Sequence, residues 1–196
     1  EEAVAFAASA DAQLTGELAV CAGSCGPGNL HLINGLYDAH RSGAPVLAIA
    51  SHIPSVEIGS GYFQETHPDR IFGECSGFNE LVLTAEQAPR MFRAAIHSAT
   101  SGHGVSVVTL PGDIAELSAA GDTIPLVLPS RPTVVPDQAS VERLAEAINA
   151  AERVAIFAGY GVRGAHDEVV ALAETIGAPI GHSLRGKEFI QYDNPY

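Results

Sequence analysis

The feature that most constrains this chain is an alternation of short apolar runs with segments of helical periodicity. Apolar runs of strand length occupy 17–22, 45–50, 79–83 and 105–110. Segments with helical spacing of apolar residues occupy 1–14, 26–41 and 85–101. Buried parallel strands are near-continuous apolar runs, and parallel neighbours require crossover connections that are usually helices. The first part of the chain therefore predicts an α/β fold with a doubly wound parallel sheet.

The alternation stops over 116–137 and then restarts. This stretch holds four prolines, Pro125, Pro129, Pro132 and Pro136. Proline at this density is typical of an extended, semi-rigid linker. Beyond it, the pattern predicts a helix over 139–150, a strand over 153–158, a helix over 165–176 and a strand from Pro179. We predict one α/β domain over 1–115, a linker over 116–137 and the start of a second α/β domain over 138–196. Both chain ends fall inside a pattern, so we expect both domains to be truncated.

Composition excludes several classes of protein. The net charge is -13 with only 10 Lys and Arg, whereas binding to a nucleic-acid backbone requires clustered cations. No apolar run approaches the roughly 18 residues of a membrane-spanning helix. The three cysteines, Cys21, Cys25 and Cys75, are an odd number and favour free thiols in a reducing compartment such as the cytoplasm. The eight histidines show no metal-ligand spacing, so we expect no metal site in the chain.

Three glycine-containing segments are candidate binding loops. Gly26-Pro27-Gly28 joins a strand to a helix, where bare backbone N–H groups favour an anion or a closely approaching ligand, although a plain tight turn fits equally. Gly159-Tyr160-Gly161-Val162-Arg163-Gly164 has dinucleotide-loop spacing, but no acidic residue is clearly placed about 20 residues later, which disfavours ordinary NAD binding. Arg185-Gly186-Lys187 follows the next strand and could hold a phosphate or ribose, or form a solvated basic turn.

Considered together, these segments resemble the thiamine-diphosphate-dependent family that includes acetolactate synthase and the pyruvate oxidases. The residues that carry the resemblance are Glu1-Glu2 before an alanine-rich helix and the segments 22–29, 61–65, 110–113 and 185–188. The resemblance covers essentially the full chain. Residues 52–55 and 63–68 are most similar to those of the bacterial quinone-linked pyruvate oxidoreductases.

The resemblance implies a three-domain subunit. Residues 1–115 would form most of the pyrimidine-binding domain for thiamine diphosphate, and 138–196 the start of a central FAD-binding domain. The Mg2+ ligands would lie after Tyr196, as would a C-terminal segment that contacts the inner face of the cell membrane peripherally. Each active site would form between two subunits of a homodimer or homotetramer.

The resemblance also implies roles for individual residues. Glu1 would hydrogen-bond N1′ of the cofactor's aminopyrimidine and so promote removal of the thiazolium C2 proton, and we expect burial to raise its pKa. Gly26, Pro27 and Gly28 would lie against the pyrimidine, and Phe63 and Gln64 near the substrate. The flavin contacts would be Gly159, Gly161, Arg163, Gly164, Arg185, Gly186 and Lys187.

The implied reaction is oxidative decarboxylation of pyruvate to acetate and CO2, with electrons passing through FAD to a quinone. One alternative is carboligation of two 2-oxo acids, as in acetolactate synthase. Another is a thiamine decarboxylase that binds flavin weakly or not at all. A third is that the 196 residues alone are a folded fragment without activity.

Overall fold

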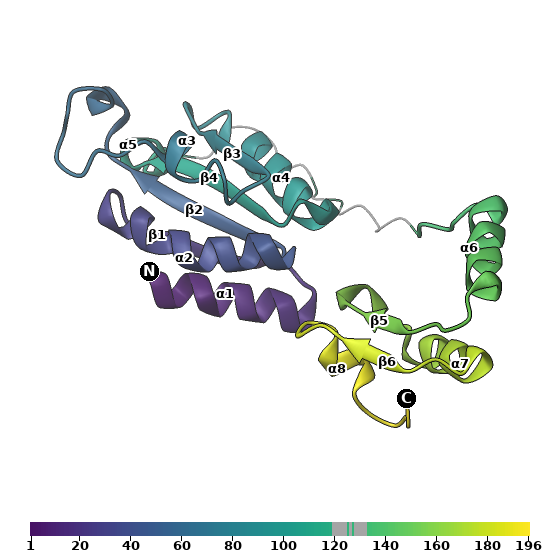
Figure 1. Cartoon of the computed structure of the whole chain (residues 1–196). Helices are drawn as coiled ribbons and strands as arrows, with labels where there is room; N and C mark the ends of the chain where they lie inside the picture. The colour runs from purple at the N-terminus through teal and green to yellow at the C-terminus, as the bar shows by residue number, and fades with distance from the viewer. Residues whose placement is uncertain (119–124, 126, 128–132) are drawn as a thin grey trace. The chain divides into compact units, whose positions relative to one another are not determined.

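A computed structural model describes residues 1–118, 125, 127 and 133–196. Its contacts divide the chain into two compact units, Glu1–Pro132 and Thr133–Tyr196 (Figure 1). Much of the linker predicted over 116–137 lies outside the described residues, so its extended conformation and the domain boundaries at 115 and 138 stay predictions.

The first unit is built on a parallel sheet of four strands. Its strands are β1 (Ala19–Gly23), β2 (Val46–His52), β3 (Phe78–Leu81) and β4 (Val105–Pro111), and they are ordered β1-β2-β4-β3. Every neighbouring pair is parallel. Its helices are α1 (Glu2–Thr15), α2 (Pro27–Ser42), α3 (Pro68–Ile71), α4 (Ala88–Ser98) and α5 (Gly112–Ala115). A 3-10 turn, η1 (Ser55–Glu57), lies between β2 and α3.

Both faces of this sheet are covered, as the apolar runs require. Along β2, Val46 and Ala48 contribute to the core that includes residues of α1 and α2, whereas Leu47 belongs to the core that includes residues of α4. Successive strand residues point to opposite faces, so a run that is apolar at every position needs cover on both sides. Figure 1 shows α1 and α2 on one face and α4 on the other. The predicted α/β parallel fold is confirmed.

The helices α1 and α2 cross closely because one side chain is absent at the crossing. A Cβ on Gly35 of α2 would lie 2.5 Å from the backbone carbonyl carbon of Ala5 in α1. Ala5, Ala8 and Ala12 are buried on the facing side of α1. Small residues on both helices therefore allow this approach, which holds the start of α1 against α2.

Two of the predicted boundaries in this unit are shifted for local reasons. The helix expected over 85–101 begins at Ala88, with Pro89 in the first turn, where its missing N–H leaves no bond unmade. It passes into a π-helical turn, η2 (Ala99–His103), in which Gly102 has φ 97°. That left-handed conformation ends the helical path before β4.

The second unit is a smaller α/β assembly. It contains the parallel strands β5 (Ile156–Ala158) and β6 (Ile180–His182), the helices α6 (Gln138–Ala150), α7 (His166–Ile176) and α8 (Lys187–Ile190), and the 3-10 turn η3 (Tyr160–Val162). Asp137 caps α6 by accepting a hydrogen bond from the Ser140 backbone N–H at 2.9 Å. The predicted second α/β unit is therefore present. In the described parts of the chain, no helix is both long enough and apolar enough to cross a membrane.

Candidate functional site

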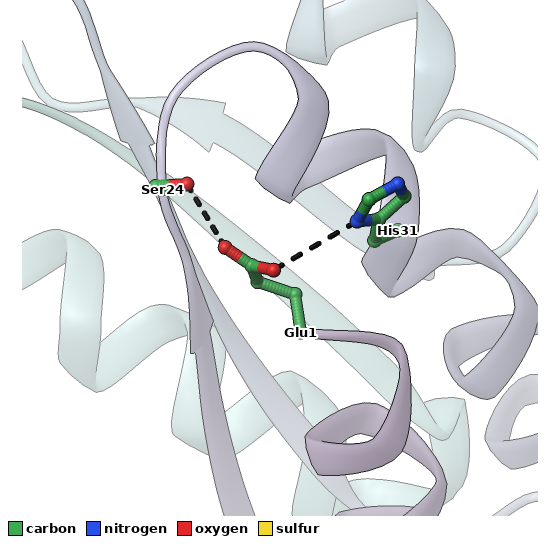
Figure 2. Close-up of polar contacts among 3 residues, drawn as sticks. All are labelled: Glu1, Ser24 and His31. Carbon is green, nitrogen blue, oxygen red and sulfur yellow. Dashed lines mark hydrogen bonds and ion pairs between the residues drawn. The ribbon is translucent and has the colours of Figure 1, made fainter.

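The candidate site begins where β1 ends and α2 starts. The Ser24 hydroxyl, just after β1, donates a hydrogen bond to Oε1 of Glu1 at 2.9 Å (Figure 2). Nδ1 of His31, in the second turn of α2, lies 3.8 Å from Oε2 of Glu1. The side chain of Glu1 is 34% exposed. The carboxyl group is thus held at one oxygen by Ser24 while the other stays accessible to a ligand.

Gly28 lies directly beneath this carboxyl group. A Cβ at position 28 would overlap the Ser24 hydroxyl and would come within 2.7 Å of Oε1 of Glu1. Gly28 belongs to the first turn of α2, which has Pro27 at its start. Only glycine leaves room for the Glu1–Ser24 pair at this place. The structure therefore brings together Glu1 and the Gly26-Pro27-Gly28 segment, two elements that the sequence suggested separately.

The protonation of Glu1 differs from the expectation. The hydrogen bond from the Ser24 hydroxyl, the largest cause, holds the pKa of the Glu1 carboxyl below its ordinary value. Burial does act to raise this pKa, as expected, but the hydrogen-bond donors outweigh it in the described chain. The physical reason is that the carboxyl group is open to solvent, so desolvation is smaller than the stabilisation of the anion by its donors.

Gln64 meets the same glycine loop from the opposite direction. Gly26 has φ 68°, and a Cβ there would lie 2.8 Å from Cβ of Gln64. Gln64 itself has φ 65°, a left-handed conformation that is uncommon for a residue with a side chain. The Cys25 thiol donates to Oε1 of Gln64 at 3.3 Å. These contacts bring the Phe63-Gln64 pair, 39 residues further along the chain, to the loop that carries Gly26 and Gly28.

The carboxylate of Glu65 organises the loop that presents Phe63 and Gln64. It accepts hydrogen bonds from the backbone N–H groups of Gly59 at 2.5 Å, Gly61 at 2.7 Å and Tyr62 at 3.2 Å. These bonds, the one from Gly59 foremost, lower the pKa of Glu65. The loop folds around this anion, and Phe63 is left 80% exposed. An exposed phenyl ring next to Gln64 offers an apolar surface to a ligand.

No site role was predicted for Ser24, Cys25 or Glu65, which lie in the segments 22–29 and 61–65. Ser24 and Cys25 directly follow a buried strand at the carboxyl edge of the sheet, where ligands of open α/β folds bind, and this position was an available signal. The signal for Glu65 was an acid in a long glycine-rich loop, which can accept several backbone N–H bonds.

In the second unit, the two other predicted loops come together at the carboxyl ends of β5 and β6. The Arg163 guanidinium donates to the Tyr160 hydroxyl at 2.7 Å, and the guanidinium carbon of Arg185 lies 4.2 Å from the centroid of the Tyr160 ring. A Cβ on Gly186 would overlap the Ala158 carbonyl oxygen at the end of β5. Two cations and a tyrosine thus gather where α/β sheets bind ligands.

The glycines of the first of these loops are not required for packing. A Cβ on Gly159 or Gly161 would meet nothing within 4 Å. Gly164 has open space as well, but its φ of 77° favours glycine. Bare backbone therefore faces open space at all three glycines of this loop, next to Arg163. Among the described residues, no group of three or more His, Cys, Asp or Glu side chains could hold a metal ion.

The chain falls in the thiamine-pyrophosphate class of protein, thiamine pyrophosphate being another name for thiamine diphosphate. Residues 1–71 match the family model of the thiamine pyrophosphate enzyme N-terminal TPP-binding domain, and residues 141–196 match the model of the central domain. The chain belongs to the thiamine pyrophosphate enzyme family, which confirms the resemblance in its sequence.

The chain is similar to relatives that carry different names. The chain is 56% identical to an uncharacterised 42.6 kDa protein of Pseudomonas amyloderamosa over all of the chain and 50% of the relative. It is 38% identical to pyruvate oxidase of Lactiplantibacillus plantarum over 97% of the chain and 32% of that enzyme. It is 32% identical to chloroplastic acetolactate synthase 2 of Zea mays over all of the chain and 31% of that enzyme. The chain thus spans 31% to 50% of the length of these relatives.

A solved structure agrees with the fold. The X-ray structure of a presumed thiamin diphosphate-dependent enzyme from Mycobacterium smegmatis superimposes with a TM-score of 0.71 at 24% identity. The match covers 93% of this chain and 36% of that one. At this level of identity the likeness supports the fold and says nothing about the reaction.

Proposed function

We propose that this chain supplies the pyrimidine-binding side of the active site of a thiamine-diphosphate- and FAD-dependent pyruvate oxidase. The whole enzyme would convert pyruvate to acetate and CO2 and pass the electrons to a quinone. The observation that carries the proposal is the solvent-accessible Glu1 carboxyl group, held by Ser24 above Gly28, with Gln64 brought to the same loop. The similarity to pyruvate oxidase supports the choice of substrate.

The residues present fit the aminopyrimidine of thiamine diphosphate. A planar heteroaromatic ring needs a carboxyl group at its nitrogen and a surface without side chains at its edge. Glu1 provides the first, with one oxygen that no described hydrogen bond occupies. Gly28 provides the second, since any larger residue would displace Glu1 and Ser24. The cradle therefore depends on the glycine at position 28.

Thiamine diphosphate, when bound, supplies an electron sink for decarboxylation of a 2-oxo acid. The task of this chain is to hold and move a proton at Oε2 of Glu1. Glu1 would exchange a proton with a ring nitrogen of the cofactor; in the described chain its pKa is lowered, mainly by the Ser24 hydrogen bond, which favours the ionised form. Gln64 would orient the substrate through its amide, and the exposed Phe63 ring would keep water from the substrate.

The remaining cofactors are assigned to other parts of the enzyme or to the second unit. We propose that Gly159, Gly161, Arg163, Gly164, Arg185, Gly186 and Lys187 contact FAD, because the bare loop and the two arginines around Tyr160 suit a phosphate or a flat ring. Mg2+ would be held by residues outside this chain. The whole enzyme would be a homodimer or homotetramer in the cytoplasm, with peripheral contact to the membrane where its quinone is dissolved.

A purified full-length enzyme that carries these residues tests the proposal directly. With pyruvate and a quinone or a reducible dye, it should release CO2 and reduce the acceptor, and it should be yellow with a flavin spectrum. Formation of acetolactate without dye reduction would instead establish the carboligase, the alternative favoured by the similarity to acetolactate synthase. A colourless, active decarboxylase would remove the FAD assignment. The 196 residues alone should show no turnover.

A further inference from the structure

In the contact between Cys25 and Gln64, the thiol is the hydrogen-bond donor and the amide oxygen is the acceptor. A side-chain amide has one oxygen that accepts and one nitrogen that donates two hydrogen bonds, whereas a neutral thiol donates one. The Cys25 Sγ lies 3.3 Å from Oε1 of Gln64, so the thiol hydrogen is directed to the amide oxygen. The Nε2 of Gln64 makes no hydrogen bond within the described residues. The two N–H donors of Gln64 are thus left for a ligand.

The rest of the Gln64 residue is held firmly enough for this direction to matter. Its Cβ and backbone pack against Gly26, where a Cβ would approach to 2.8 Å, and its φ is 65°. The next residue, Glu65, is anchored by the backbone N–H groups of Gly59 and Gly61. With the main chain held on both sides, rotation of the terminal amide is the freedom that remains. The Cys25 thiol restricts it.

We propose that Cys25 is a positioning and specificity-determining residue: it fixes the Gln64 amide so that its N–H groups bind the carboxylate of a 2-oxo acid substrate. This inference rests on the proposed function, because it takes the 2-oxo acid as the ligand of Gln64. Without the thiol, the amide can turn over and present its oxygen, which would repel a carboxylate. Cys25 acts through Gln64 and does not itself touch the reacting atoms.

The test is a double-mutant cycle in the full-length enzyme, using Cys25→Ala, Gln64→Ala and the double variant. Loss of one oriented hydrogen bond should raise KM for pyruvate by about 3- to 10-fold in Cys25→Ala, with kcat changed much less. In the Gln64→Ala background the same substitution should change KM less than twofold, because the group that Cys25 orients is gone. Cys25→Ser should restore most of the lost affinity, since a hydroxyl is also a donor.

A second readout does not depend on turnover. In the ¹⁵N-labelled 196-residue chain, the Gln64 side-chain N–H signals should shift when methyl methanethiosulfonate blocks the Cys25 thiol. The same reagent should not move them in Cys25→Ser. Equal KM effects of Cys25→Ala with and without Gln64, or unmoved Gln64 signals, would overturn the inference. An enzyme that turns over no 2-oxo acid at all would instead overturn the proposed function, so the two failures can be told apart.

Discussion

The hydroxyl of Ser24 and the carboxyl group of Glu1 are hydrogen-bonded at 2.9 Å across a separation of 23 residues. The bond joins the end of β1 to the residue that precedes α1, so the sheet and the first helix position the carboxyl group together. Ser24 uses Oε1 and thereby leaves Oε2 for a ligand. This relationship underlies the first two predictions.

Glu1→Gln in the full-length enzyme should slow deprotonation of thiamine C2 by at least about 100-fold, because an amide cannot exchange a proton with the ring nitrogen as a carboxyl group can. Hydrogen–deuterium exchange at C2, followed by NMR, measures this step directly. Glu2→Gln is the matched control, since the Glu2 carboxylate accepts a hydrogen bond from Nδ2 of Asn34 at 2.6 Å, whereas Ser24 donates to Glu1. Equal exchange rates in Glu1→Gln and the unaltered enzyme would remove Glu1 from the mechanism.

Gly28→Ala should weaken binding of thiamine diphosphate by about tenfold or more, a change of about 1.4 kcal/mol. The added Cβ overlaps the Ser24 hydroxyl and displaces Oε1 of Glu1, whose side-chain ends can move without unfolding the chain. Titration calorimetry with the cofactor measures the affinity. Gly73→Ala is the control, because its Cβ would meet backbone atoms only at 3.5 Å. An unaltered affinity in Gly28→Ala would contradict the proposed cradle.

Gly35→Ala should lower the free energy of unfolding of the first unit by up to about 2 kcal/mol. Alanine gains about 1 kcal/mol of helix propensity over glycine. The new Cβ, however, lies 2.5 Å from backbone atoms of Ala5 and Phe6, which can move only if the whole helix α1 moves. Overpacking of this kind costs about 1–3 kcal/mol or more. We expect the steric term to exceed the propensity gain. Urea unfolding, with Gly73→Ala as the reference, measures whether the free energy of unfolding falls or rises. A Gly35→Ala variant more stable than the unaltered chain would show that α1 and α2 can move apart at little cost.

One of the three thiols should react quickly with Ellman's reagent at pH 8. Burial raises the pKa of Cys21 and that of Cys75 to about 11 each, and both side chains are nearly inaccessible. Cys25 is partly exposed next to Gln64. The fast phase should therefore correspond to one thiol in the 196-residue chain and disappear in Cys25→Ser. Two fast thiols in the folded chain would contradict this placement of the cysteines.

The loop held by Glu65 should loosen in acid. Its pKa is lowered by backbone N–H donors, Gly59 first, so the folded loop favours the ionised form. That stabilisation is fully present above the unfolded glutamate pKa of about 4.3 and is lost as pH falls through the lower folded value. Amide exchange at Gly59 and Gly61 should accelerate in this window relative to the core strands. In Glu65→Gln the exchange should be fast already at neutral pH; a loop that stays protected would exclude the carboxylate as its anchor.

The fold of the first unit was predictable because its cause is local in sequence. Runs such as 45–50 and 105–110 are apolar at every position, which requires cover on both faces and so a parallel, doubly wound sheet. The resemblance then placed Glu1, the Gly26–Gly28 segment and Gln64 in one site. Residue-by-residue reasoning alone treats Glu1 as an ordinary acid at a helix start, with an effect of a few tenths of a kcal/mol.

The roles of Cys25 and Glu65 were not predictable, because each depends on a contact that the sequence does not encode locally. Glu65 finds its donors only when the main chain of 59–62 curls around it. Cys25 finds Gln64 only when a loop 39 residues away folds back onto Gly26. The lowered pKa of Glu1 was not predictable for a related reason, since the Ser24 donor that outweighs burial reaches Glu1 only in the folded chain.

The sequence by itself determined the succession of strands and helices along the chain and the positions of the glycines at the strand ends. It also determined that both faces of the sheet are covered. These properties follow from the periodicity and size of the side chains. The tertiary structure alone decided which of these glycines are steric requirements, that Ser24 holds Glu1, and which way the Gln64 amide points. Those properties arise from atoms distant in the chain that come within hydrogen-bonding distance only after the sheet has formed.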